Sequence, residues 1–153
     1  PVRGGAGWRA LAAVVVVGSG CAPGIERESE LPASPPEVVV TLTEYRFELS
    51  QDVPAGRVVF RLRNAGEAPH RPALLPLGEE LPPLEQQLRG QERSIVNPYA
   101  GTRTRVPGAT GSFAVDLVPG TRYGLICFLR DEDGSSHALK GMHHEFRTPP
   151  TPG

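Results

Sequence analysis

The feature that most constrains this chain is its density of proline and glycine, with 17 Pro and 18 Gly among 153 residues. Each proline removes a backbone donor and each glycine raises the entropy lost on ordering the chain, so long helices are disfavoured. The content of 39% hydrophobic and 22% charged residues is that of a globular protein with room for one core. Many short strands joined by turns are therefore expected.

The first 21 residues predict a targeting segment. Arg3 and Arg9 precede a charge-free apolar run at residues 10–17, which is too short to span a bilayer. Gly-Ser-Gly-Cys follows the run at residues 18–21. This ending resembles the lipobox of bacterial lipoproteins, in which the cysteine is lipidated. The resemblance implies that Cys21 carries a lipid anchor, with an ordinary secretory signal or a short buried helix as the alternatives.

Composition also divides the rest of the chain. Residues 22–37 are rich in Pro, Ser and Glu without an apolar period, and this predicts a flexible linker. Residues 38–148 carry the periodic patterns of one folded domain, and residues 149–153 form a disordered tail.

Alternating apolar residues predict the strands of this domain. Residues 38–49 alternate with one break, which indicates a strand pair or a bulged strand. The next strand has Val58, Phe60 and Leu62 on one face and arginines near the other. One short helix is expected at residues 83–91, where leucines recur four residues apart.

The C-terminal third has the clearest strand patterns. Tyr123, Leu125 and Cys127 share one face of a strand, and a last strand is expected at residues 140–148. About six to eight short strands with one helix predict an all-β, Greek-key sandwich or barrel. Pro72 predicts that its strand lies at a sheet edge, because proline cannot donate to a ladder.

Three stretches resemble the cupredoxin, or blue-copper, family. They are "RNAGEAPH", "PGTRYGLICF" and "HALKGM", within a similarity that covers roughly residues 38–147. The resemblance implies a cupredoxin-type Greek-key sandwich and one mononuclear copper site whose ligands are His70, Cys127, His137 and Met142. The segment between Cys127 and His137 is longer than in small cupredoxins, and its acidic, turn-rich sequence predicts a loop that projects into water.

These ligand types suit copper in both oxidation states. Soft sulfur ligands favour Cu(I), the imidazoles accept Cu(II), and a weak thioether fits the axial position. The resemblance therefore implies an electron carrier that is served by an unidentified redox partner protein. Together with the expected targeting segment, it predicts a monomer that is exported to the periplasm or the outer face of a bacterial membrane and held there by a lipid anchor. A copper-delivery module and a copper-free cupredoxin-like binding domain are the alternatives.

Each candidate ligand also has an ordinary structural interpretation. A lone buried cysteine is commonly a small apolar residue, His70 could bond a backbone carbonyl in a loop, and Met142 could pack in the core. The acidic segment at residues 131–134 lacks the ligand spacing of a calcium loop and is expected to be a solvated turn.

Other function classes find no support in the sequence. A formal net charge of −1 without a cluster of basic residues argues against nucleic acid as a partner. A phosphate-binding glycine loop, a serine nucleophile elbow and a paired-carboxylate arrangement are all missing from the sequence pattern. Hydrolase chemistry therefore has no support. One copper site without a second metal centre also leaves no place for substrate turnover, so we expect no enzymatic activity.

Overall fold

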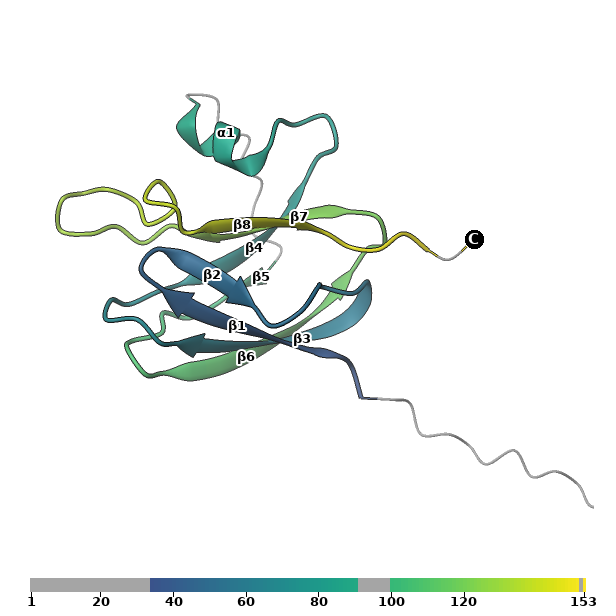
Figure 1. Cartoon of the computed structure of the whole chain (residues 1–153), viewed down its shortest axis with the longest axis horizontal. Helices are drawn as coiled ribbons and strands as arrows, with labels where there is room; N and C mark the ends of the chain where they lie inside the picture. The colour runs from purple at the N-terminus through teal and green to yellow at the C-terminus, as the bar shows by residue number, and fades with distance from the viewer. Residues whose placement is uncertain (1–33, 91–99, 152) are drawn as a thin grey trace, which may run out of the picture. The chain divides into compact units, whose positions relative to one another are not determined.

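The computed structural model describes residues 34–90, 100–151 and 153, and the expected targeting segment with Cys21 lies outside them. Eight strands and one short helix form the described part (Figure 1). Their bounds are β1 Glu37–Thr43, β2 Arg46–Leu49, β3 Gly56–Asn64, β4 Pro72–Leu77, α1 Leu84–Arg89, β5 Ala100–Gly101, β6 Thr110–Leu117, β7 Arg122–Cys127 and β8 His143–Arg147.

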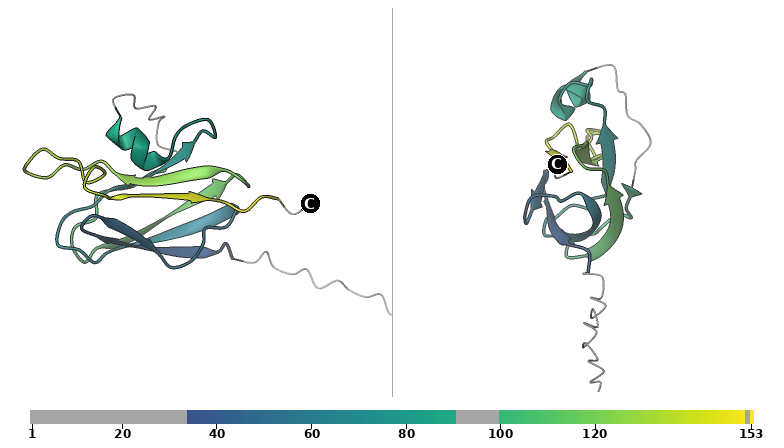
Figure 2. Two further views of the ribbon diagram at one scale, coloured as in Figure 1. Left: turned by 45° about the horizontal axis from the view of Figure 1, so that its top comes forward. Right: turned by 90° about the vertical axis from the view of Figure 1, so that its right-hand side faces the viewer.

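The strands form two four-stranded sheets packed face to face. One sheet has the order β2-β1-β3-β6 and the other has the order β5-β4-β7-β8. All pairs are antiparallel except β1 with β3, which run parallel. The two layers are visible in Figures 1 and 2, with α1 outside the second sheet. The expected all-β sandwich with one short helix is confirmed.

The main core lies between the sheets and follows from the alternation of the strands. In β3, Val58, Phe60 and Leu62 are buried, whereas the intervening Arg61 and the flanking Arg57 point to solvent. The break expected within residues 38–49 is the turn between β1 and β2, so this stretch is a strand pair.

Strand β7 is buried on both faces, because α1 covers the side away from the main core. Tyr123, Leu125 and Cys127 belong to the main core, as the alternation predicts, whereas Ile126 packs in a second cluster with leucines of α1. Gly124 permits this close approach, since a Cβ at that position would lie 2.8 Å from Leu84 Cδ2.

Two expectations about individual elements change. Pro72 does not mark a sheet edge, because β4 lies between β5 and β7. It opens its strand instead, where a missing N–H is tolerated, and its carbonyl accepts hydrogen bonds from the backbone N and the Oγ1 of Thr102. The last strand is also shorter than expected, because residues 140 and 141 lie in a turn before β8.

The beginning of β7 is fixed by a buried arginine. Arg122 forms an ion pair with Glu145 of β8, with its Nε donating to Glu145 Oε1 at 2.8 Å. Its remaining nitrogens donate to the carbonyls of Gly78, Leu81 and Pro82. This cluster, called the Arg122 cluster below, ties the segment before α1 to the second sheet.

Within the described residues, α1 is the one helix, and it is far too short to cross a bilayer.

Candidate metal centre

Three of the side chains expected to bind metal meet at one end of the sandwich. The ring nitrogens Nδ1 of His70 and His137 are 3.3 Å apart, and Cys127 Sγ is 3.6 Å from His137 Nδ1. One candidate ligand atom from each of the three lies within 4.8 Å of the others, and all three residues are buried. The described residues contain no other such group of histidine, cysteine and acidic side chains.

His70 is placed by the loop between β3 and β4. The backbone of His70 pairs with that of Arg105 in both directions, at 3.0 and 2.7 Å. Buried Asn64 donates from its side chain to the carbonyls of Ala68 and Arg105, and its Oδ1 accepts from the backbone N of Gly66. The loop is thus held on both sides, which fixes the position from which the His70 ring enters the core.

A second support of this loop is Glu44, in the turn between β1 and β2. Its Oε1 accepts hydrogen bonds from the backbone N–H groups of Glu67 and Ala68, both at 2.7 Å. The same oxygen lies 3.4 Å from His70 Nε2, although the two are not aligned well enough for a hydrogen bond. The backbone bonds, led by that from Ala68, lower the pKa of Glu44, so the carboxylate is charged.

Cys127 ends β7 directly beside the start of β4. Pro72 is its partner in the ladder, and the backbone N–H of Arg71 donates to Cys127 Sγ at 3.4 Å. Burial raises the pKa of the Cys127 thiol, and this backbone donor opposes the rise. A buried thiol with a donor aimed at its sulfur is suited to become a ligated thiolate.

The long segment after Cys127 is a hairpin that returns His137 to the site. Leu129 accepts from the backbone N of His137 at 2.8 Å, and Arg130 pairs with Ser136 further out. The segment projects beyond the sheets, in the yellow-green part of Figure 1. The expected projecting loop is therefore present, and its backbone pairing makes it a defined element.

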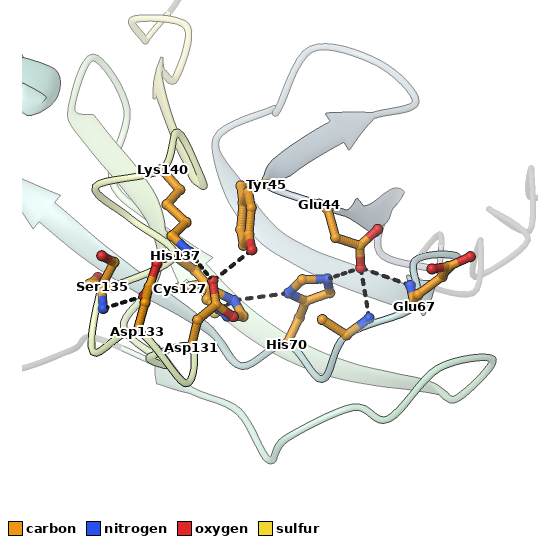
Figure 3. A network of polar contacts seen from close by, with 12 residues as sticks. Glu44, Tyr45, Glu67, His70, Cys127, Asp131, Asp133, Ser135, His137 and Lys140 are labelled. Atoms are coloured by element: carbon orange, nitrogen blue, oxygen red, sulfur yellow. Dashed lines mark hydrogen bonds and ion pairs between the residues drawn. The ribbon is translucent and has the colours of Figure 1, made fainter.

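Asp131 of this hairpin contacts His137 directly. Its Oδ1 lies 2.9 Å from His137 Nε2, and its Oδ2 accepts hydrogen bonds from Tyr45 Oη and Lys140 Nζ, both at 2.6 Å (Figure 3). Lys140 also reaches Asp133 at 2.8 Å. The bonds from Lys140 and Tyr45 hold the pKa of Asp131 far below its usual range, and Asp131 and Asp133 raise the pKa of Lys140.

Met142, the fourth expected ligand, is fully buried in the main core. Its backbone N donates to the carbonyl of His137 at 2.9 Å, and its carbonyl accepts from the backbone N of Cys127 at 3.1 Å. Gly141, with a φ of 114°, makes the turn that brings Met142 back beside these two residues. Its role as a metal ligand stays a prediction. The adjacent His143 and His144 are half-buried in β8.

Sequence reasoning did not single out Glu44, Tyr45 or Asp131. Asp131 was expected in a solvated turn, and Glu44 marked only a break in a strand pattern. Glu44 and Tyr45 lie far from their contacts along the chain, with 86 positions separating Tyr45 from Asp131. Only Asp131 had a signal in the sequence, and it is weak: Asp131 is an acidic residue six positions before the candidate ligand His137.

Comparison with known proteins identifies the fold. No protein-family profile and no curated sequence matches the chain. Among solved structures, reduced auracyanin from the photosynthetic bacterium Roseiflexus castenholzii is similar with a TM-score of 0.54 and 17% identity, over 77% of this chain and 99% of that one. Auracyanin B is similar with a TM-score of 0.53 and 19% identity, over 78% and 94% of the two chains. Both are cupredoxins, and the fold implied by the sequence resemblance is confirmed.

Proposed function

We propose that this chain, which has the cupredoxin fold, is an exported protein with one type 1 copper site and carries electrons. His70, Cys127 and His137 would hold the copper, with Met142 as the weak axial ligand. The observation that carries the proposal is the convergence of two imidazole Nδ1 atoms and one thiol sulfur in a buried space. Copper bound there would supply a one-electron couple that changes little in geometry between its two oxidation states.

The donor set fits copper better than the structural alternatives. His70 and Cys127 are fully buried and His137 is 2% exposed, so each polar atom needs a partner within the protein. The two facing Nδ1 atoms can bond each other only when one of them carries a hydrogen, and Cys127 Sγ lies at the same point. A soft cation that accepts two nitrogens and one sulfur would instead use the lone pairs of all three atoms.

The rigidity of the surroundings favours electron transfer over copper delivery. The three residues are held by the ladder of β4 with β7, by the backbone pairing of His70 with Arg105, and by the hairpin after Cys127. A delivery module must pass its metal to another protein, and such exchange is served by accessible ligands. Burial on rigid strands instead favours keeping the metal while electrons pass.

Titration of the purified protein with Cu(II) tests the proposal. An intense visible thiolate-to-copper band should develop up to one equivalent, and Cys127→Ser should abolish it. His143→Ala, at a half-buried position outside the group, is the matched control and should keep the band. A colourless wild-type protein would leave the copper-free binding domain as the function. Loss of copper on reduction would favour the delivery module.

The remaining parts of the proposal concern location and partners. Lipidation of Cys21 would hold the domain at the outer face of a membrane or in the periplasm, where a separate protein would exchange electrons with it. We propose a monomer that performs no catalysis of its own. Recovery of the mature protein in the membrane fraction, and its release into the soluble fraction by Cys21→Ser, are the expected results; an unmodified N-terminus in the wild type would support an ordinary secretory signal.

A further inference from the structure

The ring nitrogens that face away from the candidate metal position both face carboxylates. His137 Nε2 is 2.9 Å from Asp131 Oδ1, and His70 Nε2 is 3.4 Å from Glu44 Oε1. Both rings are buried, and both carboxylates come from loops at the same end of the sandwich (Figure 3). A charged carboxylate only accepts hydrogen bonds, so the ring nitrogen beside it is the one that carries the hydrogen.

This placement determines which nitrogen can bind a metal. A neutral imidazole has one N–H and one lone pair, and a hydrogen on Nε2 leaves the lone pair on Nδ1. A hydrogen on Nδ1 of His70 would instead turn the lone pair of its Nε2 toward the charged oxygen of Glu44. The carboxylates therefore select the form of each ring in which Nδ1 points its lone pair at the position beside Cys127.

We infer that Asp131 and Glu44 are positioning residues that hold His137 and His70 with Nδ1 free to ligate copper and that make both rings stronger donors. The inference rests on the proposed function and deepens it. Hydrogen bonding of the remote N–H to a carboxylate, as between His137 and Asp131, orients a metal-binding histidine and raises its basicity. Glu44, which forms no aligned hydrogen bond with His70, acts on that ring through its charge at 3.4 Å. A more basic ring favours Cu(II) over Cu(I), so both carboxylates should lower the reduction potential.

The two carboxylates are themselves fixed, which separates them from ordinary surface acids. Glu44 is held by two backbone N–H groups, and a Cβ on Gly66 would lie 2.4 Å from its Oε1, so only glycine leaves room for it there. Asp131 is held by Tyr45 and Lys140. Asp131 is held through the oxygen that does not face its ring, and Glu44 is held through the same oxygen that faces His70, so these bonds oppose rotation of either carboxylate away from its ring.

The adjacent residues Glu44 and Tyr45 therefore support both histidines from a single turn. Glu44 faces His70, and Tyr45 bonds Asp131 while its ring contacts that of His137 edge-on, with centroids 5.0 Å apart. The turn joins β1 to β2 in the first sheet, whereas Cys127 and the hairpin belong to the second. The orientation of both rings thus depends on contact between the two sheets.

Substitution of Asp131 provides the test. Asp131→Ala should weaken Cu(II) binding by about ten- to a hundredfold and raise the reduction potential, while Asp131→Asn, which keeps an acceptor oxygen, should fall between it and the wild type. Asp133→Ala is the matched control, because Asp133 also binds Lys140 but makes no contact with His137. Glu44→Gln should shift the potential in the same direction as Asp131→Ala.

A purely structural role for Asp131 gives a different result. Asp131→Ala would then lower the free energy of unfolding while Cu(II) affinity and potential stay at the values of Asp133→Ala, and the inference would be overturned. Nitrogen NMR of the copper-free protein at about pH 8, where imidazole is neutral, gives a second measurement that requires no copper. We expect the hydrogen on Nε2 of both rings, and finding it on Nδ1 of either ring overturns the inference.

These measurements separate the two proposals. A wild-type protein that develops no thiolate-to-copper band contradicts the proposed function, whatever the NMR shows. A coloured wild-type protein whose affinity and potential do not respond to Asp131→Ala or Glu44→Gln leaves the function in place and contradicts the positioning role.

Discussion

Two buried polar clusters lie at opposite ends of β7, and they differ in how fully their atoms are paired. At the first residue of the strand, Arg122 meets a carboxylate and three backbone carbonyls. At the last residue, Cys127 lies beside two histidines whose Nδ1 atoms face each other, and His70 Nε2 has no aligned hydrogen-bond partner. Hydrogen bonds within the chain complete the first cluster, whereas the second brings together two nitrogens and one sulfur that could hold a metal ion.

The difference separates structural from functional polar groups. A buried donor surrounded by acceptors contributes to folding, and replacing it leaves acceptors unpaired. Buried acceptors that converge on one point without a donor do not stabilise the fold, so folding stability does not explain why the two histidines and Cys127 lie together. The contacts of the two clusters therefore favour the one at Cys127 as the candidate metal site.

The largest effect on stability should come from the Arg122 cluster. Arg122→Met removes one partner of a largely buried ion pair and takes a donor away from Glu145 and from three carbonyls, so the free energy of unfolding should fall by on the order of 3 kcal/mol. Chemical denaturation of the copper-free protein measures this. Arg89→Met, in an exposed pair with Glu85, should change it by less than about 0.5 kcal/mol.

Copper binding by Arg122→Met then tests whether the two clusters are independent. The intensity of the thiolate band at saturation should equal that of the wild type, because no residue of the Arg122 cluster contacts the histidines. Loss of the band in a variant that remains folded would show that the clusters are coupled through β7.

Copper should stabilise the folded protein by binding at the cluster of His70, Cys127 and His137. At a free concentration of a hundred times the dissociation constant, a ligand that binds only the folded state raises the free energy of unfolding by about 2.7 kcal/mol. Denaturation with and without Cu(II) measures the increase, and Cys127→Ser should show none. Equal stabilisation of Cys127→Ser would place the copper elsewhere on the protein.

A smaller effect on stability is expected at Met142. Met142→Leu nearly conserves volume in the core and should cost less than about 1.5 kcal/mol, while the band is kept and the reduction potential rises because a weak thioether ligand is lost. Voltammetry measures the potential. An unchanged potential in this variant together with a large shift in His144→Ala would assign the axial position to His144.

The smallest effect should come from the exposed ion pair between Arg147 and Glu79. Arg147 lowers the pKa of Glu79, so this ion pair stabilises the folded state above the unfolded pKa of about 4.3, and the contribution disappears as the pH falls through the lower folded pKa. Glu79→Gln should therefore be slightly less stable than the wild type at pH 7 and equal to it in strong acid. A difference that persists in acid would have another cause.

The sequence predicted those parts of the molecule that depend on local patterns. Alternation placed Val58, Phe60 and Leu62 on the buried face of β3, and it placed Cys127 on the face of β7 that meets the main core. The order of histidine, cysteine and histidine in the sequence predicted that these three side chains belong to one site, and in the structure they lie together. The lipidation of Cys21 and the ligand roles of His70, Cys127, His137 and Met142 remain predictions.

The residues that contact the candidate ligands could not be predicted in the same way. Asp131 reads as part of a polar turn because its neighbours in sequence are acidic and small. Its contacts with Tyr45 and His137 appear only when the hairpin folds back and the two sheets meet. The prediction that Pro72 marks a sheet edge was wrong for a related reason. A proline is tolerated in an inner strand when it is the first residue, and the sequence pattern did not show that β4 begins at Pro72.

The parallel pairing of β1 with β3 affects how late in folding the candidate metal centre forms. Parallel strands need long connections, and the facing histidines are 67 positions apart in the chain. The candidate centre therefore depends on contacts between residues far apart in sequence. Proteins dominated by such contacts fold slowly, on the order of milliseconds to seconds. An unfolded chain offers a metal only scattered ligands, and local pairing of the hairpin brings His137 to Cys127 but not to His70. We expect chain collapse to come first and metal loading second, with maturation limited by the rate at which the two sheets dock.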